Sequence, residues 1–223
     1  MKNKLTKALV IGTAIIFALL FTREANASTE IAGGGEFYNG EETTINLDFD
    51  HRTTLGKWQY IIESDFYYQL EDDIEDENNL YTQFKLNREL NDKTYALVVL
   101  QVDYDKMRDY NFRNVLGLGY GRKLYVSDKW KVSNESSLAI KEGGKTETIF
   151  RNSLWVAYNP TPNLTITNKA LIESSEQRYM RIETEIEYAL TKSFAISLAN
   201  EYSEDYESEN ILTFNFKLKL NQG

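Results

Sequence analysis

His51 is the only histidine in the chain, so a hydrolase that needs an imidazole base would depend on it. The alternation of Ile45, Leu47 and Phe49 predicts that His51 faces outward, beside a short turn. The sequence places no serine or carboxylate to complete a catalytic triad with it. We therefore predict an interfacial polar residue, no catalytic site and no enzymatic activity.

An acidic run, Glu71 to Glu77, contains the carboxylates best suited to a hard cation. Asp72, Asp73, Glu75 and Asp76 are weak candidates for binding Ca²⁺ or Mg²⁺, which could bridge an outer loop to anionic lipopolysaccharide. The spacing is not that of an EF-hand, and such runs are usually solvated.

The motif G-L-G-Y-G at 117–121 has the glycine spacing of a phosphate-binding loop, but no helix is predicted after it. Inward-facing glycines of a barrel strand, which make room inside or ease a bend, explain the motif better. We therefore predict no cofactor site.

Charged residues of both signs occupy the odd-numbered positions of most predicted strands. Such side chains do not suit a dry interior, where an unpaired charge is costly, so we predict that they line a polar lumen. Either ion pairs brace and plug this lumen, or it forms a narrow path whose acidic excess favours cations. The predicted lumen-lining residues are Glu63, Asp65, Lys85, Asp103, Arg113, Lys131, Glu135, Arg151, Lys169, Arg181, Glu183 and Glu185.

The elements that would position these residues are strands with one apolar and one polar face. The clearest is Ile211–Leu220, in which Leu212, Phe214, Phe216, Leu218 and Leu220 share one parity. From Trp58 onward the apolar set stays on even numbers. The predicted strands are Glu30–Phe37, Thr43–His51, Trp58–Leu70, Leu80–Arg88, Tyr95–Tyr104, Phe112–Arg122, Trp130–Lys141, Thr148–Tyr158, Leu164–Glu173, Arg178–Leu190, Phe194–Tyr202 and Ile211–Leu220.

Twelve such strands, joined alternately by short turns and longer or more acidic loops, predict an all-β fold. The expected architecture is an antiparallel transmembrane up-and-down β-barrel with short periplasmic turns and acidic outer loops. Aromatic residues such as Trp58, Tyr95 and Trp130 follow the short turns, as in an interfacial girdle. Residues 178–190 also fit a helical stripe. A secreted soluble barrel with the even set as its core is the alternative, although twelve strands make a barrel too wide for side chains to fill.

Residues 1–27 predict a cleaved signal peptide, with Lys2, Lys4 and Lys7 before an apolar run and Ala25–Ala27 as the cleavage pattern. The apolar run Ala8–Phe21 is shorter than the about 20 residues of a membrane-spanning helix. The barrel domain would be 28–223, located in the Gram-negative outer membrane after export. Cysteine is absent, which excludes disulfides, and the net charge of −9 argues against nucleic acid as a partner.

The stretch E-I-A-G-G-G-E-F-Y-N-G-E-E-T-T-I-N-L-D-F-D at 30–50 resembles the opening hairpin of the YdiY-like putative salt-induced outer membrane protein family. Later pieces in the same order include G-K-W-Q-Y, Y-A-L-V-V-L-Q-V-D-Y and G-L-G-Y-G. The resemblance implies an outer-membrane barrel with a loose link to salt or osmotic stress, and it carries over no functional residues. The chain departs from the usual terminal aromatic of outer-membrane strands, which the barrel-assembly machinery reads; Phe214 or Phe216 would serve instead.

Two functions follow from this reading. The first is a non-enzymatic outer-membrane barrel with an envelope or osmotic-stress role, one form of which is a narrow, passive, cation-preferring pore. The second is an outer-surface binding or receptor module that uses its acidic loops. The expected partners are outer-membrane lipid and lipopolysaccharide, the assembly machinery, and Ca²⁺ or Mg²⁺.

Overall fold

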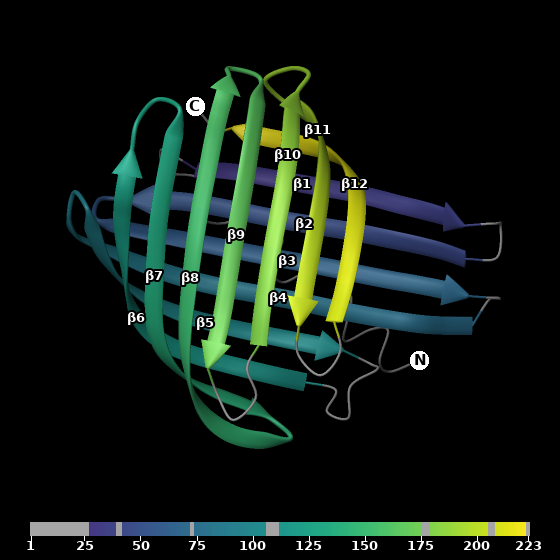
Figure 1. Ribbon diagram of the computed structural model, residues 1–223, viewed down its shortest axis with the longest axis horizontal. Coiled ribbons are helices and arrows are strands. Elements are labelled where there is room, and N and C mark those ends of the chain that lie inside the picture. The colour runs from purple at the N-terminus through teal and green to yellow at the C-terminus, as the bar shows by residue number, and fades with distance from the viewer. Residues whose placement is uncertain are drawn as a thin grey trace.

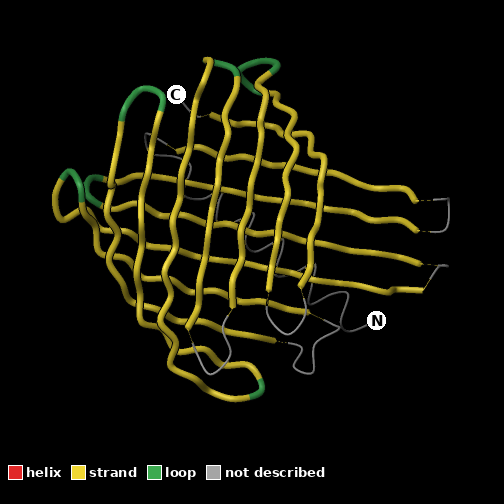
Figure 2. Tube along the Cα trace, in the orientation of Figure 1, coloured by secondary structure: helices red, strands yellow, loops and turns green. Residues whose placement is uncertain are grey.

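The chain folds into one closed barrel of antiparallel strands (Figures 1 and 2). The computed structural model describes residues 27–38, 42–71, 74–105, 112–174, 179–204 and 208–221, without some side chains at strand ends. Within these ranges no helix has the length and apolar character needed to cross a membrane. The strands are β1 (Ala27–Tyr38), β2 (Glu42–Leu55), β3 (Trp58–Glu71), β4 (Ile74–Asn91), β5 (Thr94–Asp105), β6 (Phe112–Val126), β7 (Trp130–Gly143), β8 (Lys145–Thr161), β9 (Leu164–Ser174), β10 (Tyr179–Ala189), β11 (Phe194–Glu204) and β12 (Ser208–Asn221).

Each strand pairs with its neighbours in sequence, and β12 returns to pair with β1. At this seam Glu30 lies opposite Lys219 and Ala32 lies opposite Lys217. Closure removes the free strand edges that would otherwise leave backbone groups without hydrogen bonds. The predicted fold of an up-and-down barrel of twelve strands is confirmed.

All twelve predicted strands occur at the predicted places, with differences at their ends. The ambiguous segment 178–190 forms strand β10, because its backbone pairs with β9 on one side and β11 on the other. Strand β4 begins at Ile74 rather than Leu80, since its pairing with β3 continues beyond the regularly alternating part of the sequence.

Short turns join the strands along one rim of the barrel, at the left and upper edges of Figure 1. The β2–β3 turn is the two-residue pair Gly56–Lys57, in which Gly56 adopts a φ of 60°. Leu55 pairs directly with Trp58 across it, so outward-facing positions change from odd numbers in β2 to even numbers in β3.

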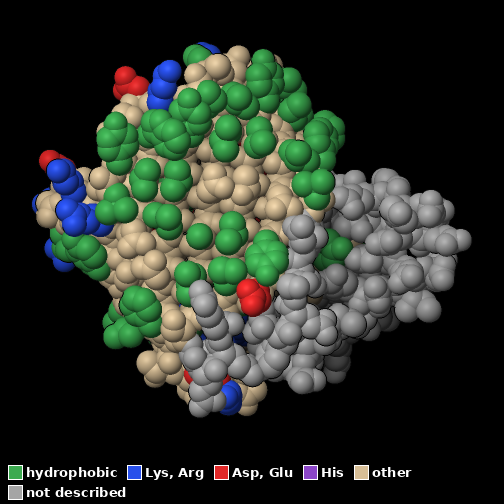
Figure 3. All heavy atoms as spheres, in the orientation of Figure 1, with side chains coloured by type: hydrophobic (Ala, Val, Ile, Leu, Met, Phe, Trp, Pro, Cys, Tyr) green, Lys and Arg blue, Asp and Glu red, His purple; other side chains and the backbone are tan. Residues whose placement is uncertain are grey.

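The outward face is apolar and exposed, as Figure 3 shows for one side of the barrel. Leu118, Leu138 and Phe216 are 64–66% exposed, and all three belong to the even-numbered apolar set. The reading of that set as the hidden core of a soluble barrel is therefore wrong. A continuous exposed apolar band is what a barrel presents to hydrocarbon.

Several polar side chains that face outward are hydrogen-bonded to one another. Ser64 Oγ lies 3.0 Å from Thr82 Oγ1, and Thr184 Oγ1 donates to Asn168 Oδ1 at 2.8 Å. Such pairing lowers the cost of placing polar groups in an apolar surrounding.

The interior is more densely packed than the strand count predicted. In Figure 1, β1–β5 pass behind β7–β11 and run in a different direction. Val115, Ala139 and Ile149 form a buried apolar cluster inside, with exposures of 0–3%. The expectation that twelve strands leave a barrel too wide to fill is wrong for this half of the barrel, because side chains of non-adjacent strands meet inside it, as Arg151 on β8 does with Gln101 on β5.

Candidate functional site: the barrel interior

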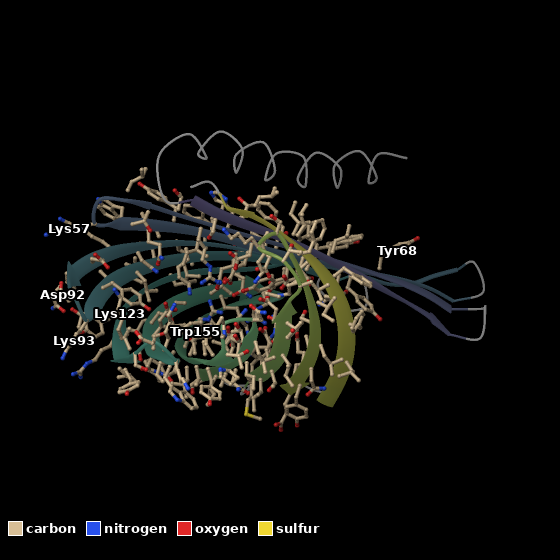
Figure 4. The ribbon with its side chains drawn as sticks, turned by 90° about the horizontal axis from the view of Figure 1, so that it is seen from above. Lys57, Tyr68, Asp92, Lys93, Lys123 and Trp155 are labelled. Atoms are coloured by element: carbon tan, nitrogen blue, oxygen red, sulfur yellow. The ribbon has the colours of Figure 1, made fainter. Side chains whose placement is uncertain are left out.

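The inward face is identified by contacts between strands that are not neighbours. Lys85 Nζ on β4 donates to Glu135 Oε2 on β7 at 2.8 Å, and Arg151 Nη2 on β8 donates to Gln101 Oε1 on β5 at 2.7 Å. Side chains of non-adjacent strands can meet only through the interior. Figure 4 shows inward side chains filling the middle of the barrel, with Trp155 among them.

A buried charge cluster, which we call the brace, joins β5, β6, β8 and β9. Glu173 accepts a hydrogen bond from Arg113 Nη2, and its Oε1 lies 2.9 Å from Arg151 Nε. Asp103 Oδ2 lies 3.5 Å from Arg113 Nε. The side chains of Glu173, Arg113 and Arg151 are only 1–6% exposed. Together with the apolar cluster at Val115, the brace forms a dry half of the interior.

The glycines of the G-L-G-Y-G motif make room inside the barrel. A Cβ on Gly121 would lie 2.2 Å from the ring of Tyr95, its direct partner on β5. The Tyr95 hydroxyl donates to Glu135 Oε1 at 2.7 Å, so the ring is held over the glycine. An aromatic ring covering a cross-strand glycine is a known device for fixing strand register.

Gly121→Ala is expected to destabilise the barrel by about 1–3 kcal/mol, because the added methyl overlaps the Tyr95 ring. The free energy of unfolding, measured by denaturant titration of the folded protein, tests this. In a Tyr95→Ala background the same methyl meets no ring, so its cost should nearly disappear. An equal cost in both backgrounds would show that the glycine is needed for another reason.

The other half of the interior is charged and accessible to water, and we call it the wet wall. Arg181 on β10 contacts Glu183 at 2.7 Å, Glu201 at 2.8 Å and Asp65 on β3 at 3.9 Å. Lys169 on β9 lies 3.2 Å from Glu183. Although these side chains point into the barrel, Lys169 is 47% exposed and Asp65 is 43% exposed. Water-accessible space therefore exists beside β3, β9 and β10.

Strand β2 extends the wet wall. Arg52 donates to Asp50 with its Nη2 at 2.8 Å from Oδ2, and the same nitrogen lies 3.3 Å from Glu63 Oε1. Gln83 Nε2 donates to the other oxygen of Glu63 at 2.8 Å. The Arg52 and Asp50 side chains are 40% and 31% exposed.

Lysines hold the barrel seam from inside. Lys217 Nζ on β12 lies 2.7 Å from Glu30 on β1, 2.6 Å from Glu185 and 3.3 Å from Glu187. Lys219 also contacts Glu187 and Glu30. These pairs add side-chain contacts to the backbone pairing that closes the barrel.

The predicted lumen residues divide between these groups. Arg113, Arg151 and Asp103 belong to the brace, Lys85 pairs with Glu135, and Glu185 lies at the seam. Lys131 is exposed at the short-turn end of β7. The remaining predicted residues, Glu63, Asp65, Lys169, Arg181 and Glu183, lie on the wet wall.

The sequence-based set omitted several interior residues. Asp48, Asp50 and Arg52 were missed although Leu47 and Phe49 already mark odd numbers as outward on β2. Glu173 and Gln101 share the odd parity of the predicted set, and the brace depends on them. The other omitted interior residues with ion pairs are Glu30, Glu187, Glu201, Lys217 and Lys219.

The remaining candidates do not form a site within the described residues. Asp72 and Asp73 lie outside these residues, and Glu75 and Asp76 belong to β4 but their side chains are not described. In the described part of the chain, no group of three or more histidine and carboxylate side chains could hold a metal ion. His51 pairs with Thr29 across the outward face, with its Nδ1 2.8 Å from Thr29 Oγ1. Its ring is only 1% exposed, which its predicted interfacial position did not anticipate.

An apolar exterior, a charged interior and a closed antiparallel sheet define the fold of outer-membrane porins, and solved structures agree. The NanC porin superposes with a TM-score of 0.58 at 10% identity, over 87% of this chain and 100% of that chain. The COG4313 outer membrane channel from Pseudomonas putida F1 gives 0.53 at 8% identity, over 87% and 94%. The KdgM porin in complex with disordered oligogalacturonate gives 0.52 at 8% identity, over 88% and 99%.

The chain belongs to the family described as "Protein of unknown function, DUF481", whose model matches residues 38–211. The resemblance to YdiY-like proteins is consistent with this membership. No curated protein matches the chain in sequence.

Proposed function

We propose that this protein is a narrow, passive, cation-preferring channel of the outer membrane rather than an enzyme. The observation that carries the proposal is the wet wall: its charged side chains are enclosed by the barrel and are nevertheless 19–47% exposed, from Arg181 at the low end to Lys169 at the high end. Enclosed but hydrated charges are typical of an aqueous path. The brace and the apolar cluster narrow this path by filling the opposite half.

Cation preference follows from the balance of charge along the path. Carboxylates outnumber basic groups on the wet wall, so a mobile cation meets a net negative lining. The KdgM porin is described in complex with oligogalacturonate, a polyanion. Such a ligand would be repelled here, so we do not extend it to this protein. The carboxylates are Asp48, Asp50, Glu63, Asp65, Glu183 and Glu201, and the basic groups are Arg52, Lys169 and Arg181.

The outer membrane is the proposed location because the exposed apolar band requires a lipid surrounding and the barrels of similar fold are described as porins and outer membrane channels. Export by a cleaved signal peptide at residues 1–27 is part of the same proposal. An envelope role under salt or osmotic stress rests on the family resemblance. Transcript levels after a salt upshift would test it: unchanged levels would contradict induction.

Planar-bilayer recording of the refolded protein tests the channel. We expect small, steady conductance steps and a reversal potential of cationic sign under a KCl gradient. Replacing Asp48, Asp50 and Asp65 together by asparagine should bring the reversal potential close to zero. A folded, inserted barrel without conductance would contradict the channel and favour a braced scaffold, whereas an anionic reversal potential would contradict cation preference alone.

A further inference from the structure

Charge is almost absent from the outward face of the strands, and its few positions are ordered. Among the outward strand side chains that the structure describes, the charged ones are Arg88, Arg122, Glu142 and Glu204. Both arginines lie near the short-turn rim, and both glutamates lie near the opposite rim. All four are exposed. The arginines therefore face the surroundings of the barrel at one edge of its apolar band.

The turns beside the two arginines reinforce their charge. Lys57, Lys93, Lys129 and Lys192 are exposed, each on a different short turn. Figure 4 shows Lys57 and Lys93 at the same end of the barrel, and Figure 3 shows basic side chains along this edge. Asp92 and Asp128 are the acids of these turns. This rim is therefore basic in a chain whose net charge is −9.

The register places the two arginines on the strands that flank β5, close to its small residue Ala96. Ala96 on β5 pairs directly with Arg88 on β4 and with Tyr120 on β6. Arg122 pairs with Thr94, two residues along β5 from Ala96. Strand spacing and rise put the Cα atoms of the two arginines roughly 12 Å apart. The Arg88 guanidinium lies over Trp58 on β3, and rotation of this side chain toward β5 would let both arginines contact one phosphate. Over Ala96, only a methyl group lies between Arg88 and Tyr120.

Aromatic residues fix the depth of this place relative to the membrane. The Arg88 guanidinium lies over the ring of Trp58, 5.2 Å from its centroid. Trp130 and Tyr158 stack with their centroids 4.2 Å apart at the same rim. Tryptophan and tyrosine collect at the level of lipid headgroups. The guanidinium of Arg88 is therefore held where a phospholipid has its phosphate.

We propose that Arg88 and Arg122 bind the phosphate of an anionic phospholipid, with its acyl chain along the outward stripe of Ala96, Val98 and Leu100. The inference rests on the membrane placement proposed above and adds the lipid class to it. Guanidinium groups bind phosphate through paired hydrogen bonds and keep their charge in any accessible pH range. The basic turns attract anionic headgroups to the rim, and the two outward arginines select them by contact.

Tryptophan quenching by brominated lipids tests this in reconstituted full-length barrel. The chain has three tryptophans, of which Trp155 points inward, so Trp130→Phe leaves Trp58 as the reporter beside Arg88. We expect brominated phosphatidylglycerol to quench Trp58 with a roughly ten-fold higher apparent affinity for this site than brominated phosphatidylcholine. In the double variant Arg88→Gln/Arg122→Gln, the two lipids should quench Trp58 equally. The single variant Arg122→Gln should lose part of the preference for phosphatidylglycerol. The matched control is Lys145→Gln, which removes an exposed positive charge at the opposite rim of the barrel and should keep the preference.

Equal quenching by both lipids in the starting protein would overturn the proposal, and so would a preference that survives the double substitution. Displacement of the brominated lipid by millimolar glycerol phosphate would mean that a soluble phosphate is the ligand, which also contradicts it. Quenching by neither lipid would contradict membrane placement itself. Lipid preference without conductance would leave this inference standing and refute only the channel.

Discussion

Glu173→Leu is expected to destabilise the barrel by about 3–5 kcal/mol, because it leaves two buried arginines without their shared carboxylate. Arg113 and Arg151 are 5% and 6% exposed, so solvent cannot replace the lost partner. Asp103 and Gln101 contact the two arginines but supply only one full charge between them. The free energy of unfolding from denaturant titration measures the loss.

A matched control and a rescue separate charge from shape. Glu142→Leu removes an exposed carboxylate near the loop rim and should change stability by less than about 0.5 kcal/mol. Arg113→Met and Arg151→Met added to Glu173→Leu should recover much of the loss, because apolar side chains replace the two unpaired arginines, while Asp103 keeps its hydrogen bonds from Gln101. If the triple variant is as unstable as Glu173→Leu, the unpaired charges are not the cause.

Arg181→Ala is expected to strengthen cation preference in single-channel recordings. Its guanidinium faces Asp65, Glu183 and Glu201, and without it these carboxylates act on the path without a counter-charge. One unit charge about 5 Å from a permeating ion in water is worth about 0.8 kcal/mol, with opposite signs for a cation and an anion, so the cation-to-anion permeability ratio should change roughly 16-fold. Loss of a long side chain that reaches from β10 toward β3 should also raise the conductance.

Salt dependence makes the Arg181 result specific. At 1 M salt the Debye length is about 3 Å, so the change in permeability ratio should largely disappear while the rise in conductance remains. Lys129→Ala, on an exposed short turn, is the control and should leave both quantities unchanged. A lower conductance or an unaltered permeability ratio at low salt would place Arg181 away from the ion path.

The strands, and the side of the barrel that each residue faces, could be predicted from the sequence because side-chain alternation is a local property. A strand sends successive residues to opposite sides, so Leu212–Leu220 on one parity and Lys217 and Lys219 on the other already separate outside from inside. Residues 178–190 were ambiguous because Ile182 and Ile186 also fit a helical stripe. They form a strand because their backbone pairs with β9 on one side and with β11 on the other.

Partners across the lumen could not be read from the sequence, because they depend on how the closed sheet is shaped. Arg113 and Glu173 are 60 positions apart and sit on strands separated by two others, so no local pattern relates them. Only the approach of opposite walls brings them together. For the same reason the sequence left open whether ion pairs plug the polar lumen or leave a narrow path, whereas the structure divides the interior into a dry half and a wet half.

By itself, therefore, the sequence determined the twelve strands, their connectivity and the side of each residue, since hydrophobic alternation and turn residues act over a few positions. The tertiary structure alone decided which charges neutralise one another, where water enters, and that Arg88 and Arg122 lie on the two strands that flank β5, on an outer face with few charges. Those features arise from barrel closure and cross-strand register, which join residues that are remote in the chain.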